Sequence, residues 1–237
     1  MCLLLAVRNE GASRLWVGAN RDEHVARPWR PPALLVTDPP VLGGLDVEGG
    51  GSWLAVNLQA GFVVGVTNAR LGARPGRRSR GQLVLDAAMQ PSLPAAVALL
   101  TEVDADSYGA FNLLLVDAAA AYVATNYPSQ RLDLLDDALI ALGNELLGGG
   151  GGRTAAALQA LEPALGGGDA EMPTALARLL ADHRGADPFC RHFGPFGTVS
   201  STICELRDGR LTSYLFAPGP PCRTPFAPVP IPEVPYS

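Results

Sequence analysis

The chain opens with two short apolar runs separated by a polar turn, and the second run ends in a group of polar residues. The runs are residues 2–7 (Cys-Leu-Leu-Leu-Ala-Val) and 15–19 (Leu-Trp-Val-Gly-Ala), on either side of the Gly-containing segment 8–13. Such runs, bounded by turn residues, are typical of strands buried on both faces. We therefore expect an antiparallel hairpin in which Val7 pairs with Leu15, which places Cys2 opposite Asn20.

This hairpin brings a thiol close to several polar side chains. Arg21, Asp22 and Glu23 follow Asn20 directly, and paired residues in an antiparallel ladder lie only about 4.5–5.5 Å apart. Taken alone, a Cys at position 2 is more often a small buried apolar residue. Taken alone, the polar quartet is more often a solvated loop. Their placement at the two ends of one hairpin favours a functional site.

The chemistry of such a site follows from its groups. Removal of Met1 would leave Cys2 with both a thiol, whose ordinary pKa is about 8.5, and an α-amine, whose ordinary pKa is about 7.7–8.0. The amine is then partly neutral near pH 7 and can take the thiol proton, directly or through one water. The charge of Arg21 would lower the thiol pKa, and Asp22 would orient the ammonium form. With Met1 retained, only an ordinary thiol remains.

Composition limits the class of protein. The 237 residues suit a single domain over 1–237, with a Pro-rich tail at 218–237. The apolar fraction of 48% predicts an ample core, and the net charge of −5 argues against nucleic-acid or anionic-membrane binding. No apolar run approaches the ~20 residues of a membrane span. The first apolar run is short and no basic residue precedes it, so we expect no signal peptide and a cytoplasmic protein.

Two further features concern the source and the redox state. All 18 basic residues are Arg, and with the many Ala, Gly and Pro residues this composition predicts a GC-rich bacterial genome. The four cysteines lack any close CxxC pairing, so reduced thiols are expected.

The rest of the chain reads as hairpins interspersed with helices. We expect hairpins at 52–56 with 62–67, ending at Asn68, and at 198–206 with 211–215 around the turn Asp208-Gly209. Further strands are expected at 34–36, 112–116, 122–125 and 138–142, a Pro-rich loop at 27–32 and a flexible stretch at 43–51. Helical spacing occurs at 82–89, 94–100, 154–161 and 174–182, with Ser92 as an N-cap. This order predicts an α+β fold of antiparallel sheet covered by helices.

Several short motifs occur in an order that resembles a known family. They are Met1-Cys2, residues 18–23 with Arg27-Pro28, Ser52-Trp53-Leu54, Thr67-Asn68, residues 80–84, Phe111-Asn112-Leu113, Gly143-Asn144, and Gly197-Thr198 with Ser201-Thr202-Ile203. The chain resembles the NRDE family, also called Transport and Golgi organisation protein 2-like. That family is similar to N-terminal-nucleophile hydrolases, so the resemblance implies a four-layer αββα sandwich of two antiparallel sheets.

The resemblance also implies roles for residues. Bile-salt hydrolases and penicillin V acylases likewise begin with Met-Cys, and their Arg-Asn-x-Asp element is matched by Asn20 and Asp22, with Ala19 where their Arg stands and Arg21 beside it. Asn68 and Asn144 correspond to oxyanion donors, although each also suits a turn. A late Arg of that class has no counterpart in Val199-Ser200-Ser201. The predicted catalytic set is Cys2, Asn20, Arg21, Asp22, Asn68 and Asn144.

Residues outside this set have simpler interpretations. Glu23, Arg70 and Arg80 are predicted to contact substrate, and the Arg-rich loop 70–80 is otherwise a solvated loop. Cys190 and His192 are two ligands without partners, too few for a zinc site, so no metal is expected.

Two functions remain open. The first is an N-terminal cysteine hydrolase acting on a small amide or related acyl substrate. The second is a non-catalytic protein that binds and moves haem, lipid or acyl-CoA, because members of the family are linked to such ligands. No CxxCH motif occurs, so haem would be a non-covalent ligand rather than a built-in cofactor. The oligomeric state is not predicted.

Overall fold

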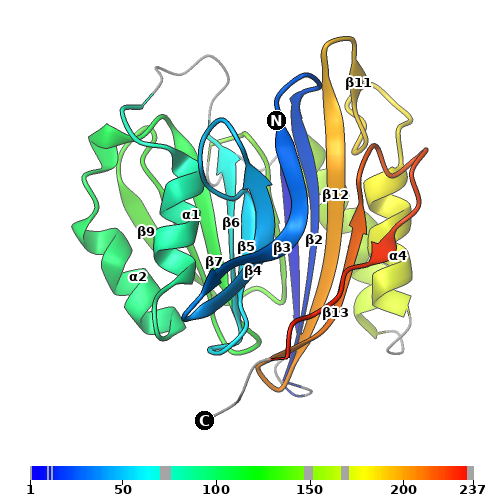
Figure 1. The fold of residues 1–237 in the computed structure, drawn as a ribbon. Helices are drawn as coiled ribbons and strands as arrows, with labels where there is room; N and C mark the ends of the chain where they lie inside the picture. The colour runs from blue at the N-terminus through cyan, green and yellow to red at the C-terminus, as the bar shows by residue number, and fades with distance from the viewer. Residues whose placement is uncertain are drawn as a thin grey trace.

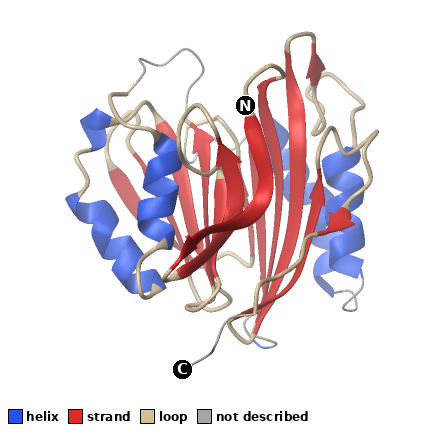
Figure 2. Ribbon diagram, viewed as in Figure 1, coloured by secondary structure: helices blue, strands red, loops and turns tan. Residues whose placement is uncertain are grey.

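The protein is described here by a computed structural model covering residues 2–9, 11, 13–69, 76–146, 152–166 and 171–233. Two antiparallel sheets face each other, with helices on both outer surfaces (Figure 1, Figure 2). Within the described residues each sheet has seven strands. The predicted four-layer αββα sandwich, an N-terminal-nucleophile hydrolase-like architecture, is confirmed.

The first sheet has the order β10 (Leu139–Leu142), β1 (Leu3–Asn9), β2 (Arg14–His24), β12 (Phe196–Arg207), β13 (Arg210–Ala217) and β14 (Ala227–Pro228), and β11 (His192–Phe193) pairs with β12. The second runs β3 (Trp29–Thr37), β4 (Pro40–Asp46), β5 (Leu54–Asn57), β6 (Phe62–Asn68), β7 (Phe111–Val116), β8 (Ala121–Thr125) and β9 (Arg131–Leu135). The α-helices are α1 (Arg80–Ala88), α2 (Leu93–Glu102), α3 (Gly152–Leu161) and α4 (Glu171–Ala181), with short 3₁₀ turns at Ala105–Ser107 and Glu162–Gly166.

Strand β1 shows why the layers form. Its side chains alternate between the two faces of the sheet. Leu4 and Ala6 pack between the sheets, whereas Leu3 and Leu5 pack beneath α3 and α4. A third apolar cluster joins α1 and α2 to the outer face of the second sheet. Burial on both faces explains the unbroken apolar run at the start of the chain.

The first hairpin forms as predicted, but its register differs by one residue. Val7 pairs with Trp16 and Leu3 with Asn20, so the same register places Cys2 opposite Arg21. The predicted turn was too long, because Arg8 continues β1. Its buried guanidinium donates hydrogen bonds to the carbonyls of Ala119 at 2.9 Å and of Asp137 at 3.0 Å. A shift of one residue exchanges the faces on which side chains lie.

The stretch predicted to be flexible at 43–51 is partly strand. Strand β4 includes Gly43 and Gly44. A Cβ on Gly44 would lie 2.2 Å from the ring of Trp53, and one on Gly43 would lie 2.7 Å from the carbonyl oxygen of Leu54. These glycines therefore permit close packing within a strand rather than flexibility.

The prediction of a loop at 27–32 is also wrong in part, because β3 begins at Trp29. Strand β3 lies at the edge of its sheet, and its pairing with β4 is irregular between Arg30 and Ala33. Proline is tolerated at such positions because no ladder hydrogen bond is lost there. Strand β9 was not predicted, because its polar residues break the apolar pattern.

Other local predictions are confirmed. Asp208 and Gly209 have φ values of 50° and 71°, as a two-residue hairpin turn requires. The Ser92 side chain accepts a hydrogen bond from the backbone N–H of Ala95 at 3.3 Å and caps α2. No helix among the described residues is both long and apolar enough to cross a membrane.

Candidate active site

Cys2 lies at the wall of a cavity of about 320 Å³ formed where β2 and β6 end. The segment that leads into α1, the loop between β4 and β5, and Gly109 just before β7 complete it. Six of the predicted site residues line this cavity: Cys2, Arg21, Asp22, Glu23, Asn68 and Arg80. Sequence reasoning missed the other main contributors, which include Arg27, Asp46, Ser52 and Trp53.

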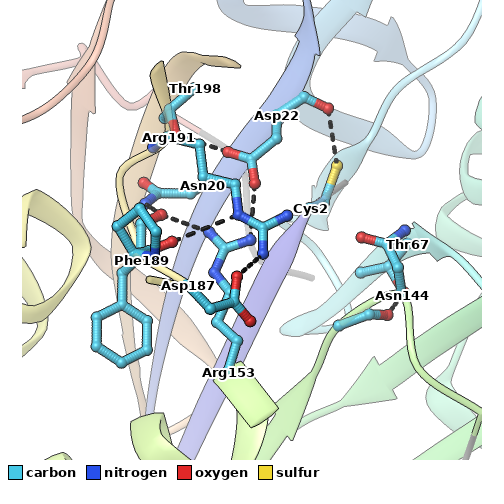
Figure 3. Close-up of polar contacts among 12 residues, drawn as sticks. Cys2, Asn20, Asp22, Thr67, Asn144, Arg153, Asp187, Phe189, Arg191 and Thr198 are labelled. Carbon is cyan, nitrogen blue, oxygen red and sulfur yellow. Dashed lines mark hydrogen bonds and ion pairs between the residues drawn. The ribbon is translucent and has the colours of Figure 1, made fainter. Parts of the chain in front are cut away.

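The Cys2 thiol is half-buried and meets the end of β2 through the backbone (Figure 3). Its Sγ lies 3.9 Å from the carbonyl oxygen of Asp22. The Asp22 carboxylate accepts a hydrogen bond from the Thr198 hydroxyl at 2.6 Å and one from Arg153 Nη1 at 2.7 Å. Both side chains of the Arg153–Asp22 ion pair are at most 3% exposed. The site therefore rests on a buried charge pair beside the thiol.

Arg153 and Thr198 are the functional residues that sequence reasoning missed most clearly. No late Arg was found near Thr198, yet a buried Arg reaches Asp22 from α3. A signal was present, because Arg153 shares the buried face of α3 with Ala157 and Leu161 at helical spacing. A cation in an apolar helical stripe indicates a buried anionic partner.

Arg21 supplies a positive charge inside the cavity. Its guanidinium carbon lies 4.6 Å from the centroid of the Trp53 ring, and Nη2 is 3.1 Å from the Asp46 carboxylate. Nη1 is buried and has no hydrogen-bond partner among the described residues. A buried donor without a partner is costly, and the guanidinium of Arg21 brings a fixed positive charge to this part of the cavity wall.

Asp46 anchors this group of charges. Arg27 Nε donates to the same carboxylate at 2.8 Å, and the Gly49 backbone N–H donates at 2.8 Å. Burial alone would raise the Asp46 pKa, but the Arg27 and Gly49 hydrogen bonds and the charges of Arg27 and Arg21 hold the pKa below its ordinary value. Asp46 therefore stays ionised and fixes the position of Arg21.

Arg80 also lines the cavity, from the start of α1. Its Nη1 donates to the Ala110 carbonyl at 3.1 Å. Burial lowers the pKa of this guanidinium, and the neighbouring charges of a Cys2 thiolate and of Glu23 partly oppose that effect. Glu23 itself accepts from the His24 backbone N–H at 2.8 Å. The predicted substrate contact Arg70 lies outside the described residues.

The two predicted oxyanion donors occupy different positions. Asn68 lines the cavity at the end of β6. Asn144 does not appear among the described cavity-lining residues, and its Nδ2 donates to the Asn68 carbonyl oxygen (Figure 3). Thr67 Oγ1 donates to the Gly143 carbonyl at 2.5 Å, so a second hydrogen bond joins the end of β6 to the segment that contains Asn144. The Asn144–Asn68 contact places Asn144 against Asn68, and the role of Asn144 as a direct oxyanion donor stays a prediction.

Asn20 lies away from the described cavity wall. It is fully buried, and its Nδ2 donates to the carbonyls of Leu180 at 2.9 Å and Phe189 at 2.8 Å. In the observed register it pairs with Leu3, whose side chain faces the helices. Asn20 therefore ties β2 to the end of α4 rather than lining the described cavity wall.

Comparison with known proteins agrees with these features. Residues 1–185 match the family described as Transport and Golgi organisation 2. The Bos taurus "Transport and Golgi organization protein 2 homolog" is 35% identical over 117 residues, which are 47% of this chain and 42% of that protein. The chain thus matches less than half the length of this curated relative.

Two solved structures were also found to be similar. A Caenorhabditis elegans "N-acylethanolamine-hydrolyzing acid amidase (NAAA) ortholog" superposes with a TM-score of 0.63 at 16% identity, over 85% of this chain and 92% of that one. HslV from Trypanosoma brucei gives a TM-score of 0.42 at 13% identity, over 86% and 99% of the two chains. The likeness to the amidase shows the fold.

One prediction from composition is contradicted. The Arg-only, Ala- and Gly-rich sequence predicted a bacterial source, whereas the curated relative is bovine. Residue usage follows base composition and does not by itself identify the kind of organism. The ordered motifs were the better guide, and the match over residues 1–185 shows that the chain belongs to the Transport and Golgi organisation 2 family.

Proposed function

We propose that this protein is an N-terminal cysteine hydrolase that cleaves a small amide or related acyl substrate after removal of Met1. The observation that carries this proposal is the place of Cys2 at the wall of an open cavity, together with Arg21, Arg80 and Asn68. A named amidase of the same fold supports an amide substrate.

The proposed reaction begins when the α-amine of Cys2 takes the thiol proton. The thiolate attacks the substrate carbonyl carbon, and the carbonyl electron pair moves onto oxygen. Collapse of the tetrahedral intermediate breaks the C–N bond, and the ammonium returns its proton to the leaving amine. Water, deprotonated by the free α-amine, then hydrolyses the thioester, and the thiol is restored. This is the nucleophile-and-base scheme of N-terminal catalysis.

The charges of the cavity support this chemistry. Arg21 and Arg80 both lie at the cavity wall with Cys2, so negative charge that develops on a substrate oxygen there meets positive charge. The residues that line the cavity carry more positive than negative charge, because they include five Arg residues and three carboxylates. The Arg residues are Arg21, Arg27, Arg77, Arg78 and Arg80. An acyl substrate with an anionic or strongly polar group fits such a wall.

Cavity size limits the substrate further. The volume of about 320 Å³ lies at the lower end of the range of about 300–1,000 Å³ usual for small-molecule sites. The guanidinium of Arg21 places a fixed positive charge at this wall, which suits a polar substrate group. We therefore infer a compact acyl compound rather than a long peptide.

The function is tested by incubating the purified protein with a panel of N-acyl amino acids, N-acylethanolamines and acyl thioesters, and measuring the released products by mass spectrometry. Turnover that is lost on alkylation of Cys2 supports the proposal. Tight binding of an acyl-CoA, a lipid or haem without any turnover would instead favour the binding role.

Replacing Asn68 by Ala is expected to lower kcat by about 10²–10³, because one donor to the developing oxyanion is lost. KM should change little, since the donor acts mainly in the transition state. Gln59→Ala is the matched control, because it removes an exposed amide at the opposite end of the same hairpin. An unchanged kcat in Asn68→Ala would remove Asn68 from the oxyanion site.

Replacing Arg21 by Met is expected to raise KM for carboxylate-bearing acyl substrates about tenfold or more, because a charge-assisted hydrogen bond contributes about 1.5–3 kcal/mol. Neutral acyl substrates should be affected less. Steady-state kinetics on paired substrates, with and without the carboxylate, measures the difference. An equal effect on both members of each pair would show that Arg21 does not select the anionic group.

A further inference from the structure

A second group of reactive side chains lies away from the Cys2 cavity, where three segments meet. Cys190 follows the end of α4, and its backbone N–H donates to the Asp182 carbonyl at 2.9 Å. His192 begins β11, and Cys222 lies in the C-terminal segment after β13. The chain has four Cys and three His residues, and two of each gather here once His183 is included.

The distances among three of these side chains match a tetrahedral metal centre. The Cys190 and Cys222 sulfur atoms are 3.5 Å apart, and His192 Nε2 lies 3.8 Å from Cys190 Sγ and 3.1 Å from Cys222 Sγ. A tetrahedral zinc ion with bonds of about 2.0–2.3 Å separates its ligand atoms by about 3.3–3.8 Å. The three observed separations are close to this range.

His183 is the remaining side chain near this group that can donate to a metal. A ring nitrogen of His183, Cys222 Sγ and a ring nitrogen of His192 all lie within 4.8 Å of one another. His183 is exposed just beyond α4, so its side chain can close the remaining gap by changing rotamer.

We propose that Cys190, Cys222, His192 and His183 bind one zinc ion. Four protein ligands of the Cys₂His₂ type fill a tetrahedral shell, which is the arrangement of structural rather than catalytic zinc. Two thiolates and two neutral imidazoles leave the bound ion electrically neutral, so the nearby Arg223 is compatible with it. Sequence spacing indicated only Cys190 and His192. The fold adds His183 from the segment after α4 and Cys222 from the C-terminal segment.

The position of the ligands links this site to the Cys2 cavity. The residue before Cys190 is Phe189, whose carbonyl accepts hydrogen bonds from Asn20 and Arg153 (Figure 3). The residue after it is Arg191, whose backbone N–H donates to Thr198 Oγ1 at 2.8 Å. Thr198 and Arg153 are the residues that hold Asp22. A metal ion bound at Cys190 therefore fixes the segment that supports Asp22, and it ties the C-terminal segment to the first sheet.

The test is the zinc content of the reduced, full-length protein after loading with zinc and removal of excess metal. We expect about one zinc per chain in the wild type, and loss of it in Cys222→Ser and in His192→Gln. Cys2→Ser and His24→Gln are the controls, because they remove the same residue types elsewhere and should retain zinc. Cobalt substitution gives a second readout, since a Cys₂His₂ site shows thiolate-to-cobalt absorption, which we expect in the wild type and not in Cys222→Ser or His192→Gln.

Folding is checked independently, because Cys222 and His192 lie near the surface and their variants should keep the circular dichroism of the wild type. Chelation should lower the Tm of the wild type by several degrees and leave that of Cys222→Ser unchanged. The proposal is overturned if the reduced wild type takes up no zinc, or if folded Cys222→Ser and His192→Gln bind zinc as the wild type does.

Discussion

Replacing Cys2 by Ala is expected to lower kcat for the proposed acyl substrate by on the order of 10⁴–10⁶, because no other described residue at the cavity supplies an attacking sulfur. The Cys2 thiol is the only thiol among the described residues that lines the cavity containing Arg21 and Asn68. The measurement is the steady-state rate with the best substrate from the acyl panel. Residual activity reports only positioning and oxyanion stabilisation.

A matched variant separates loss of the nucleophile from loss of a thiol in general. Cys204 is fully buried in the core between the sheets, so Cys204→Ala should cost about 1 kcal/mol of stability and retain its kcat. Cys2→Ala, in contrast, should keep the unfolding free energy of the wild type, because the side chain is half-buried at the start of β1. Equal kcat values for Cys2→Ala and wild type would refute covalent catalysis.

The second large effect is expected on stability, when Arg153 is replaced by Met. The variant is expected to lose about 3–5 kcal/mol of unfolding free energy, because removal of one partner leaves a buried charge without compensation. The Asp22 carboxylate is 0% exposed, and its hydrogen bond from Arg153 is 2.7 Å long. Urea unfolding followed by circular dichroism measures the loss.

The double variant Arg153→Met with Asp22→Asn shows whether the pair is coupled. Removing both charges should be much milder than the sum of the single effects, as expected for a buried ion pair. Arg178→Met provides the control, since Arg178 is an exposed Arg on α4 and should change stability by less than about 0.5 kcal/mol. Additive effects of Arg153 and Asp22 would contradict the account of a single buried pair.

The sequence predicted most of the strands and helices because their apolar patterns are local. Strand β1 and the hairpin of β12 and β13 were found in this way. The register of the first hairpin was predicted wrongly, because a charged residue such as Arg8 is more usual in a turn than in a buried strand. Here Arg8 is buried, and its guanidinium donates hydrogen bonds to carbonyls far along the chain. Strand β4 was missed because adjacent glycines such as Gly43 and Gly44 usually indicate a flexible segment. In the structure these glycines lie in a strand, where the missing side chains leave room for Trp53 and for the backbone of Leu54.

The sequence predicted those residues of the candidate site that lie at the ends of strands. It did not predict the contacts that arise only when separate elements pack together. Cys2, Asp22 and Asn68 follow from the hairpins, and all three line one cavity. The Arg153–Asp22 pair depends on how α3 lies across the first sheet, and the Arg21–Trp53 contact depends on how the two sheets face each other. No pattern within a single segment specifies such contacts.

Intact-mass analysis of the protein, acid-quenched during turnover of an acyl substrate and followed by peptide mapping, tests the central claim most directly. The account predicts a chain that lacks Met1 and carries the acyl group on Cys2. A chain that retains Met1, or that forms product with no acyl group on Cys2, would contradict it.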